Sequence, residues 1–218
     1  MRDDERYCPH VKTLFDEPED DDEVIEIEEP FDDAIPHVHS ALSCAGDLEA
    51  IFGECIRTAL DEVIDTARTG RWDLKQCGDQ EKAYVGVKVE NVIRGRFELP
   101  PARRKMPDYE IDGVDVDCKW SKNMWGWSIP TEAVDQICIL VHGDDDKSGF
   151  CVGLARIRNN LLNPGANKDG KRTLSRNGRG AIYWICPPDS PLPRNYLLHM
   201  PGEDRDAILA HRGGDAWL

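Results

Sequence analysis

Apolar and polar side chains alternate strictly in Gly113-Val114-Asp115-Val116-Asp117-Cys118-Lys119-Trp120. A period of two is typical of a β-strand that packs one face against a core. On such a strand Asp115, Asp117 and Lys119 share one face, and the apolar side chains share the other. The stretch therefore predicts a half-buried strand that presents two carboxylates and an ammonium group on the same side.

Another carboxylate, Asp108, lies nine residues before Asp117, at the start of Asp108-Tyr109-Glu110-Ile111-Asp112. A turn at Asp112-Gly113 would fold this segment back along the strand and bring Asp108 beside Asp117. The order is then a proline, an acid, a short strand, a glycine turn and Asp-x-Lys. This motif is short and arises often by chance, so the residues around it are needed to support the interpretation.

Hydrolysis of a phosphodiester explains why these residue types occur together. Mg²⁺ prefers hard oxygen ligands, keeps several waters and takes only one or two carboxylates. Bound at a phosphate, it neutralises charge and lowers the pKa of a bound water. We expect Asp108, Asp117 and the Cys118 carbonyl to hold Mg²⁺. Lys119 would orient the attacking water and stabilise the developing negative charge.

A helix predicted over residues 80–97 contributes a further carboxylate. Glu90 shares a face with the apolar residues three positions before and after it. A carboxylate on such a face is uncommon unless it has a partner. Two interpretations stay open: Glu90 reaches the metal site from the helix, or it pairs with Arg94 or Lys88 at the surface.

Helical and strand patterns elsewhere predict an α/β or α+β fold. Residues 47–69 have helical spacing of apolar positions, and Gly70 supplies the stop. The remaining expected elements are strands over 136–142 and 150–157 around a hairpin turn, a loop over 159–172, a helix over 175–185 and a proline-rich, weakly helical end over 186–218. The first of these two strands is apolar on both faces, as expected of a central strand.

Charge is distributed unevenly along the 218 residues. Residues 1–35 hold fifteen of the 42 acidic residues and three of the 27 basic ones. They account for −12 of the net charge of −15, which leaves −3 for residues 36–218. We expect a disordered acidic tail over 1–35 and a single domain over 36–218. The overall acidity therefore does not exclude DNA as a partner.

Several protein classes are disfavoured by the sequence. The longest apolar runs fall far short of the ~20 residues that a membrane-spanning helix needs. The N-terminus has no apolar segment typical of a signal peptide. The eight cysteines form no Cys-x-x-Cys pair, which argues against a zinc ribbon or a thioredoxin-like site. We expect a cytoplasmic protein with no membrane partner.

The sequence resembles the catalytic core of NaeI-type type II restriction endonucleases over about residues 45–185. The resemblance is carried by Glu81-Lys82-Ala83-Tyr84-Val85-Gly86-Val87-Lys88-Val89-Glu90, by residues 108–119, and by residues 126–130, 152–154 and 163–175. More distantly, the helix acid followed by Asp…Asp-x-Lys is similar to MutH-like nicking enzymes. Both groups share the PD-(D/E)xK fold, which implies a mixed β-sheet flanked by helices.

The resemblance implies a Mg²⁺-dependent, sequence-specific endonuclease that cuts both DNA strands. The family's catalytic positions match Glu90, Asp108, Asp117 and Lys119, and all four residue types are present. Cleavage at a palindrome needs two-fold related sites, so a homodimer is expected, with a cognate DNA methyltransferase as a further partner. NaeI-type enzymes carry a second, C-terminal DNA-binding domain. Only 33 residues follow Ile185, so we expect that domain to be absent here.

Basic residues in two places are candidate DNA contacts. Side chains of this kind bind phosphates or, in the case of arginine, guanine edges. The candidates are Arg103 and Arg104 just before the first aspartate, Lys168, Lys171 and Arg172 in the long loop, and Arg176 and Arg179 in the helix after it. The alternative for each cluster is a solvated basic surface.

Two other functions stay open. A MutH-like nicking or repair endonuclease would cut one strand, and its plasmid product would be open-circular instead of linear. A non-catalytic DNA-binding or DNA-mimicking regulator would act through the acidic tail and keep the site residues as structural ion pairs. Deletion of residues 1–35 distinguishes the regulator from a nuclease. A DNA mimic would lose its function without the tail, whereas a nuclease would keep or gain cleavage activity.

Overall fold

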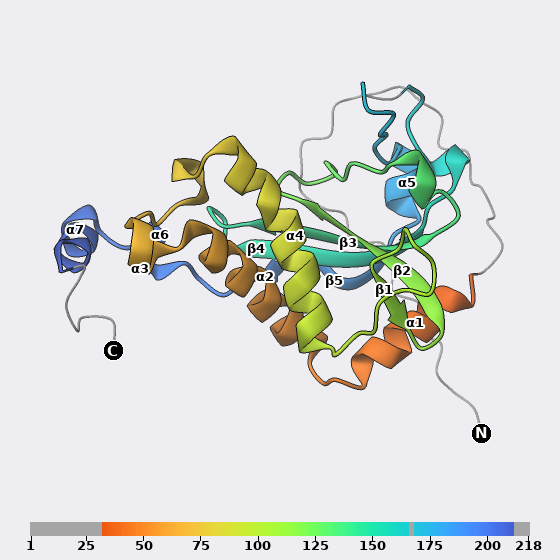
Figure 1. The fold of residues 1–218 in the computed structure, drawn as a ribbon, viewed down its shortest axis with the longest axis horizontal. Helices are drawn as coiled ribbons and strands as arrows, with labels where there is room; N and C mark the ends of the chain where they lie inside the picture. Colours follow the sequence, from red (N-terminus) through yellow and green to blue (C-terminus); the bar gives the residue numbers. More distant parts are fainter. Residues whose placement is uncertain (1–31, 166–167, 212–218) are drawn as a thin grey trace.

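A five-stranded mixed β-sheet forms the centre of the computed structural model, which describes residues 32–165 and 168–211 (Figure 1). In spatial order the strands are β1 (Tyr109–Ile111), β2 (Val114–Ser121), β3 (Ile137–Asp144), β4 (Gly149–Arg156) and β5 (Tyr183–Pro191). Strands β2 and β3 run parallel, and every other neighbouring pair is antiparallel. A mixed sheet flanked by helices confirms the expected fold class and agrees with a restriction-endonuclease-like fold.

Two long helices, α2 and α4, pack together on one face of the sheet (Figure 1). The helices are α1 (Ala34–Ser43), α2 (Leu48–Ile64), α3 (Thr66–Thr69), α4 (Asp79–Arg96), α5 (Arg176–Gly180), α6 (Tyr196–His199) and α7 (Gly202–Ala210), with short 3₁₀ segments at Leu74–Gln76, Thr131–Ala133 and Asn159–Leu161. Within the described ranges, no helix has the length and apolar character needed to cross a membrane. The helix predicted over 80–97 and the two strands predicted over 136–142 and 150–157 are confirmed.

Both faces of the sheet are buried. On the helix side, Val116 and Cys118 of β2 join Phe52 of α2 and Val89 of α4 in one core. On the opposite side, the fully buried Trp127 belongs to a second hydrophobic cluster that includes residues of β3 and β4. The alternation predicted for β2 is therefore confirmed, and its polar positions lie on the face opposite to the helices.

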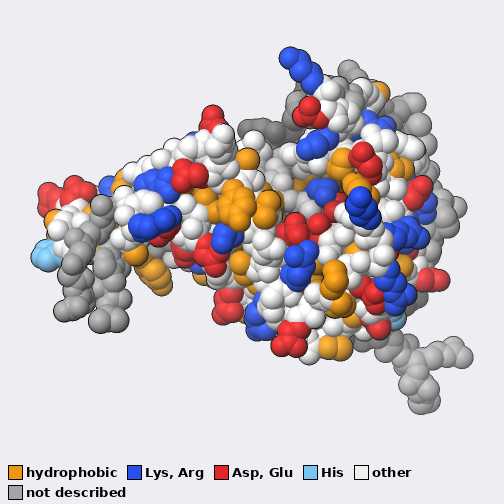
Figure 2. Space-filling model, in the orientation of Figure 1, with side chains coloured by type: hydrophobic (Ala, Val, Ile, Leu, Met, Phe, Trp, Pro, Cys, Tyr) orange, Lys and Arg blue, Asp and Glu red, His pale blue; other side chains and the backbone are white. Residues whose placement is uncertain are grey.

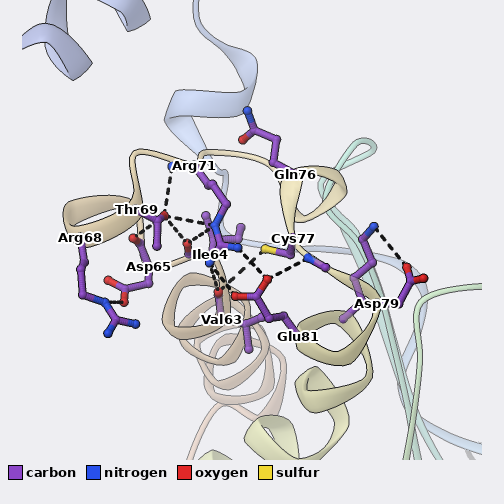
Figure 3. Close-up of polar contacts among 12 residues, drawn as sticks. Val63, Ile64, Asp65, Arg68, Thr69, Arg71, Gln76, Cys77, Asp79 and Glu81 are labelled. Carbon is purple, nitrogen blue, oxygen red and sulfur yellow. Dashed lines mark hydrogen bonds and ion pairs between the residues drawn. The ribbon is translucent and has the colours of Figure 1, made fainter.

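A dense polar network joins the end of α2 to the start of α4 (Figure 3). The helix predicted to continue to Thr69 is interrupted at Asp65, whose backbone is left-handed with φ 50°. The Thr69 hydroxyl donates to the Ile64 carbonyl at 2.9 Å. The Arg71 guanidinium then makes two hydrogen bonds to the Glu81 carboxylate, at 2.7 and 2.9 Å. This network fixes where α4 begins and hence where its later residues lie.

We expect the Glu81→Gln variant to be less stable than wild type near neutral pH. The hydrogen bonds from Arg71 and the Gly78 N–H lower the pKa of Glu81 from 4.5 to about 2. Stability that depends on an ionised carboxylate is complete above its ordinary pKa and is lost as the pH falls through its folded value. The difference in Tm should therefore shrink between about pH 5 and pH 2, as measured by circular dichroism. A difference that stays constant over this range would contradict the assignment.

The helix predicted over residues 175–185 is wrong beyond Gly180. Ser175 caps α5, and its hydroxyl accepts a hydrogen bond from the Gly178 N–H at 3.1 Å. From Tyr183 the chain forms β5, because aromatic and β-branched residues favour an extended backbone. The prolines of this strand are tolerated since β5 lies at the edge of the sheet. The fold therefore extends past residue 185, the end of the expected core.

Residues 1–31 of the predicted acidic tail lie outside the described part of the chain. Asp32 forms an ion pair with Arg156 of β4. Helix α1 begins at Ala34 and buries Val38 completely against the core. A deletion that spares the described fold therefore ends at residue 31.

Candidate active site

The β1–β2 hairpin places the two predicted aspartates next to each other. Asp112 and Gly113 adopt left-handed backbones, with φ of 46° and 84°, and form the turn. The Asp108 N–H donates to the Val116 carbonyl at 3.1 Å. Asp108 Oδ2 in turn accepts a hydrogen bond from the N–H of Cys118 at 2.8 Å. The predicted turn is confirmed, and Asp108 is fixed through both its backbone and its side chain.

Asp117 is almost fully buried and has two side-chain partners. It forms an ion pair with Lys119, the next residue on the same face of β2. The thiol of Cys138 donates to Asp117 Oδ2 at 3.7 Å from the facing position on β3. The Lys119 ammonium also donates to the Cys118 carbonyl at 3.3 Å. One aspartate, one lysine and one backbone carbonyl therefore meet at the middle of β2.

Burial and, after it, the neighbouring carboxylates shift the pKa values of these residues. Burial, followed by the contact with Asp117, raises the pKa of Asp108 from 3.8 to about 6, although Cys118 N–H and Lys119 oppose the shift. Burial and then Asp108 raise the pKa of Glu90. Burial alone would lower the pKa of Lys119, but Asp117 overrides it and raises that pKa. The site thus gathers carboxylates whose negative charge Lys119 and Arg94 only partly balance.

Glu90 of α4 is ion-paired with Arg94, as one of the two interpretations expected, and its reach to a metal stays a prediction. Its Oε1 accepts a hydrogen bond from Arg94 Nη2 at 2.8 Å. It also interacts electrostatically with Asp108 and with Lys119. Lys88, the other candidate partner, instead pairs with Glu62 at 2.6 Å. Glu90 is therefore ion-paired on α4 and is close enough to Asp108 for the two carboxylates to repel each other.

The oxygen-rich composition of this group suits a hard divalent cation. Over residues 32–165 and 168–211, no cluster of three or more His, Cys, Asp or Glu side chains is arranged to hold a metal by itself. Two adjacent aspartates and a backbone carbonyl match the few protein ligands that Mg²⁺ takes while it keeps several waters. The like-charge contact that raises the pKa of Asp108 is the kind of contact that a bound cation relieves. The donor set therefore fits Mg²⁺.

Arg103 and Arg104 lie on the surface beside the hairpin and pair with acidic side chains. Arg103 makes two hydrogen bonds to Glu110, at 2.5 and 2.8 Å, and its N–H donates to Asp115 at 2.8 Å. Arg104 lies 3.6 Å from the same Asp115 carboxylate. Asp115 therefore serves the hairpin surface and does not join Asp108 and Asp117. Figure 2 shows acidic and basic side chains interspersed over this face of the molecule.

The other five basic candidates lie on α5 and the loop before it. Lys168, Lys171 and Arg176 are exposed. Arg172 donates to Asn159 at 2.5 Å, and the Arg179 guanidinium lies 5.3 Å from the centre of the Trp125 ring. A hollow of about 410 Å³ in this region is lined by Ser128, Asn163, Pro164, Gly165, Lys171, Arg172 and Thr173. In Figure 1, α5 lies on the same side of the molecule as β1 and β2, opposite α7.

Comparison with known proteins assigns the chain to a family. The family model described as restriction endonuclease NaeI matches residues 40–217. This chain belongs to the NaeI restriction endonuclease family. It is 36% identical over 155 residues to the type II restriction enzyme NaeI of Lentzea aerocolonigenes, a match that covers 71% of this chain and 48% of the relative. The chain thus spans about half the length of this NaeI relative, and the resemblance noted in the sequence is confirmed.

In this member of the NaeI family, three residues around the site were not predicted to belong to it. Cys138 contacts Asp117 because β2 and β3 run parallel in one particular register, which the sequence does not reveal. Tyr109 is fully buried, and its hydroxyl donates to the Glu90 carbonyl at 2.9 Å. Arg94 was considered only as a surface partner of Glu90. The sequence signal for Arg94 was its position four residues after Glu90, which places the two side chains on one face of a helix.

Proposed function

We propose that this chain is a Mg²⁺-dependent, sequence-specific endonuclease that cuts both strands of DNA. The observation that carries the proposal is the β1–β2 hairpin, which holds Asp108 on the N–H of Cys118, next to the Asp117–Lys119 ion pair. Membership of the NaeI family supports a restriction activity. DNA in the cytoplasm is the proposed substrate, and a cognate methyltransferase would protect the host sites.

The proposed roles follow from the chemistry of each group. Asp108, Asp117 and the Cys118 carbonyl would hold Mg²⁺, with Glu90 contributing from α4. Bound Mg²⁺ supplies charge neutralisation at the phosphate and a water of lowered pKa. The Lys119 ammonium orients the attacking water and stabilises negative charge that develops on the phosphate oxygens. Its ion pair with Asp117 keeps it protonated for this purpose, since the pair raises its pKa.

DNA would be held by basic side chains from the hairpin and from α5 and the loop before it. Arg103 and Arg104 would contact the phosphate backbone from the hairpin. The basic side chains of α5 and its preceding loop would contact phosphates or base edges. These are Lys168, Lys171, Arg172, Arg176 and Arg179. A homodimer would present two such sites to a palindrome.

Cleavage of supercoiled plasmids with Mg²⁺ or with EDTA tests the proposal. We expect discrete linear fragments that require Mg²⁺ and that map to one short sequence. Open-circular product alone would instead favour the nicking or repair endonuclease. DNA binding by folded protein without cleavage of several plasmids would favour the non-catalytic regulator.

A further inference from the structure

Arg94, in the last turn of α4, connects two acidic residues that come from separate elements. Its Nη2 donates to the Glu90 carboxylate at 2.8 Å and to the backbone carbonyl of Asp108 at 3.2 Å. Its Nη1 donates to Asn91 at 3.2 Å. One guanidinium therefore bridges the helix to the residue that precedes β1.

Tyr109 makes a second connection between the same two segments. Its ring lies 5.5 Å from the Arg94 guanidinium, within the range of a cation–π contact. Its hydroxyl donates to the backbone carbonyl of Glu90 at 2.9 Å. Arg94 thus reaches from α4 to the backbone of Asp108, and Tyr109 reaches back from β1 to the backbone of Glu90. The two contacts fix the helix acid relative to the first aspartate.

The environment of Arg94 differs from that of a side chain extended toward DNA. Its side chain is 35% exposed, compared with 65% for Arg103 and 71% for Arg104. Its Nε is buried and has no hydrogen-bond partner among the described residues. A buried polar atom without a partner is uncommon, and here other contacts of the same side chain hold it in place. Those contacts are the ones to Glu90 and Asp108.

We propose that Arg94 is a positioning residue that fixes the Glu90 carboxylate relative to the backbone of Asp108 and thereby supports Mg²⁺ binding at the proposed site. The inference rests on the proposed nuclease function and adds a residue to it. Without the guanidinium, Glu90 would lose its partner and swing toward solvent. The packing of Ile93 and Tyr109, both fully buried, would still hold α4 against the hairpin. Arg94 variants should therefore fold.

Metal binding without DNA tests this role directly. Arg94→Met keeps the apolar part of the side chain and removes every donor, and Arg94→Lys keeps the charge but not the fork of donors. The matched control is Arg96→Met, which removes the same charge from an exposed position on the same helix. We expect Arg94→Met to weaken Mg²⁺ binding 10- to 100-fold in calorimetry. Arg94→Lys should fall between this variant and wild type, and Arg96→Met should match wild type.

DNA affinity with EDTA separates positioning from phosphate contact. If Arg94 is a positioning residue, Arg94→Met should leave the DNA affinity and its salt dependence unchanged. Cleavage by the variant should then require higher Mg²⁺ concentrations. A phosphate contact would instead weaken DNA binding and reduce the salt slope by about one. Wild-type Mg²⁺ affinity in folded Arg94→Met would overturn the inference and leave the nuclease proposal intact. A wild-type protein that neither binds Mg²⁺ nor cuts plasmids would overturn both.

Discussion

Replacement of Lys119 by alanine is expected to abolish cleavage, with the rate falling about 10³-fold, because the group that stabilises the developing charge is lost. The ammonium touches both Asp117 and the Cys118 carbonyl, so it lies where the proposed metal ligands converge. DNA affinity should change little, since the proposed DNA contacts are made by other cations. Single-turnover plasmid cleavage measures the rate, and gel shift with Ca²⁺ in place of Mg²⁺ measures the affinity.

A lysine three residues later provides the control for this variant. Lys122 is exposed in the segment after β2, so Lys122→Ala removes the same charge from the neighbourhood of the site but not from its centre. Lys122→Ala should keep most of the activity. Full cleavage by Lys119→Ala would exclude the proposed role, and an equal loss in both variants would indicate a general effect of positive charge on DNA binding.

The centre of the site was predictable because it depends on local patterns. The alternation in β2 and the glycine turn before it are encoded within a dozen residues, and together they bring Asp108 to Asp117. Both features depend on backbone preferences and on one buried face. They did not require knowledge of the rest of the fold.

The surroundings of the site were not predictable because they depend on packing between distant segments. Cys138 meets Asp117 only through the register of β3, and Arg94 meets the Asp108 carbonyl only through the packing of α4 on the hairpin. The strand over Tyr183 was mistaken for a helix because a short apolar run does not distinguish the two. The break in the first long helix at Asp65 was missed because the expected stop was Gly70. Asp65 adopts a left-handed backbone although it is not a glycine.

The substitution Asp108→Asn is expected to abolish cleavage and, in EDTA, to raise the stability of the protein. An asparagine carbonyl can keep the hydrogen bond from Cys118 N–H, and its amide can donate to Asp117 where two carboxylates now repel each other. The pKa of about 6 means that ionised Asp108 opposes folding. After allowance for solvent screening, the gain is about 1–2 kcal/mol, or a few degrees in Tm.

The pH dependence of this gain follows from the same shift. A carboxyl with a raised pKa favours the folded state when protonated, and this contribution is lost as the pH rises through about 6. The Tm of Asp108→Asn should therefore exceed that of wild type by more at pH 8 than at pH 5, with both proteins in EDTA. Added Mg²⁺ should stabilise wild type but not the variant, because a ligand stabilises only the state that binds it.

Asp115→Asn is the matched control, since Asp115 lies on the same face of β2 but pairs with Arg104 and the Arg103 N–H. It should show no gain in Tm and should keep the response to Mg²⁺. A lower Tm for Asp108→Asn in EDTA at pH 8 would show that the two aspartates do not repel each other in the metal-free protein. Opposite effects of one substitution on activity and stability are expected where a site holds like charges together for a cation.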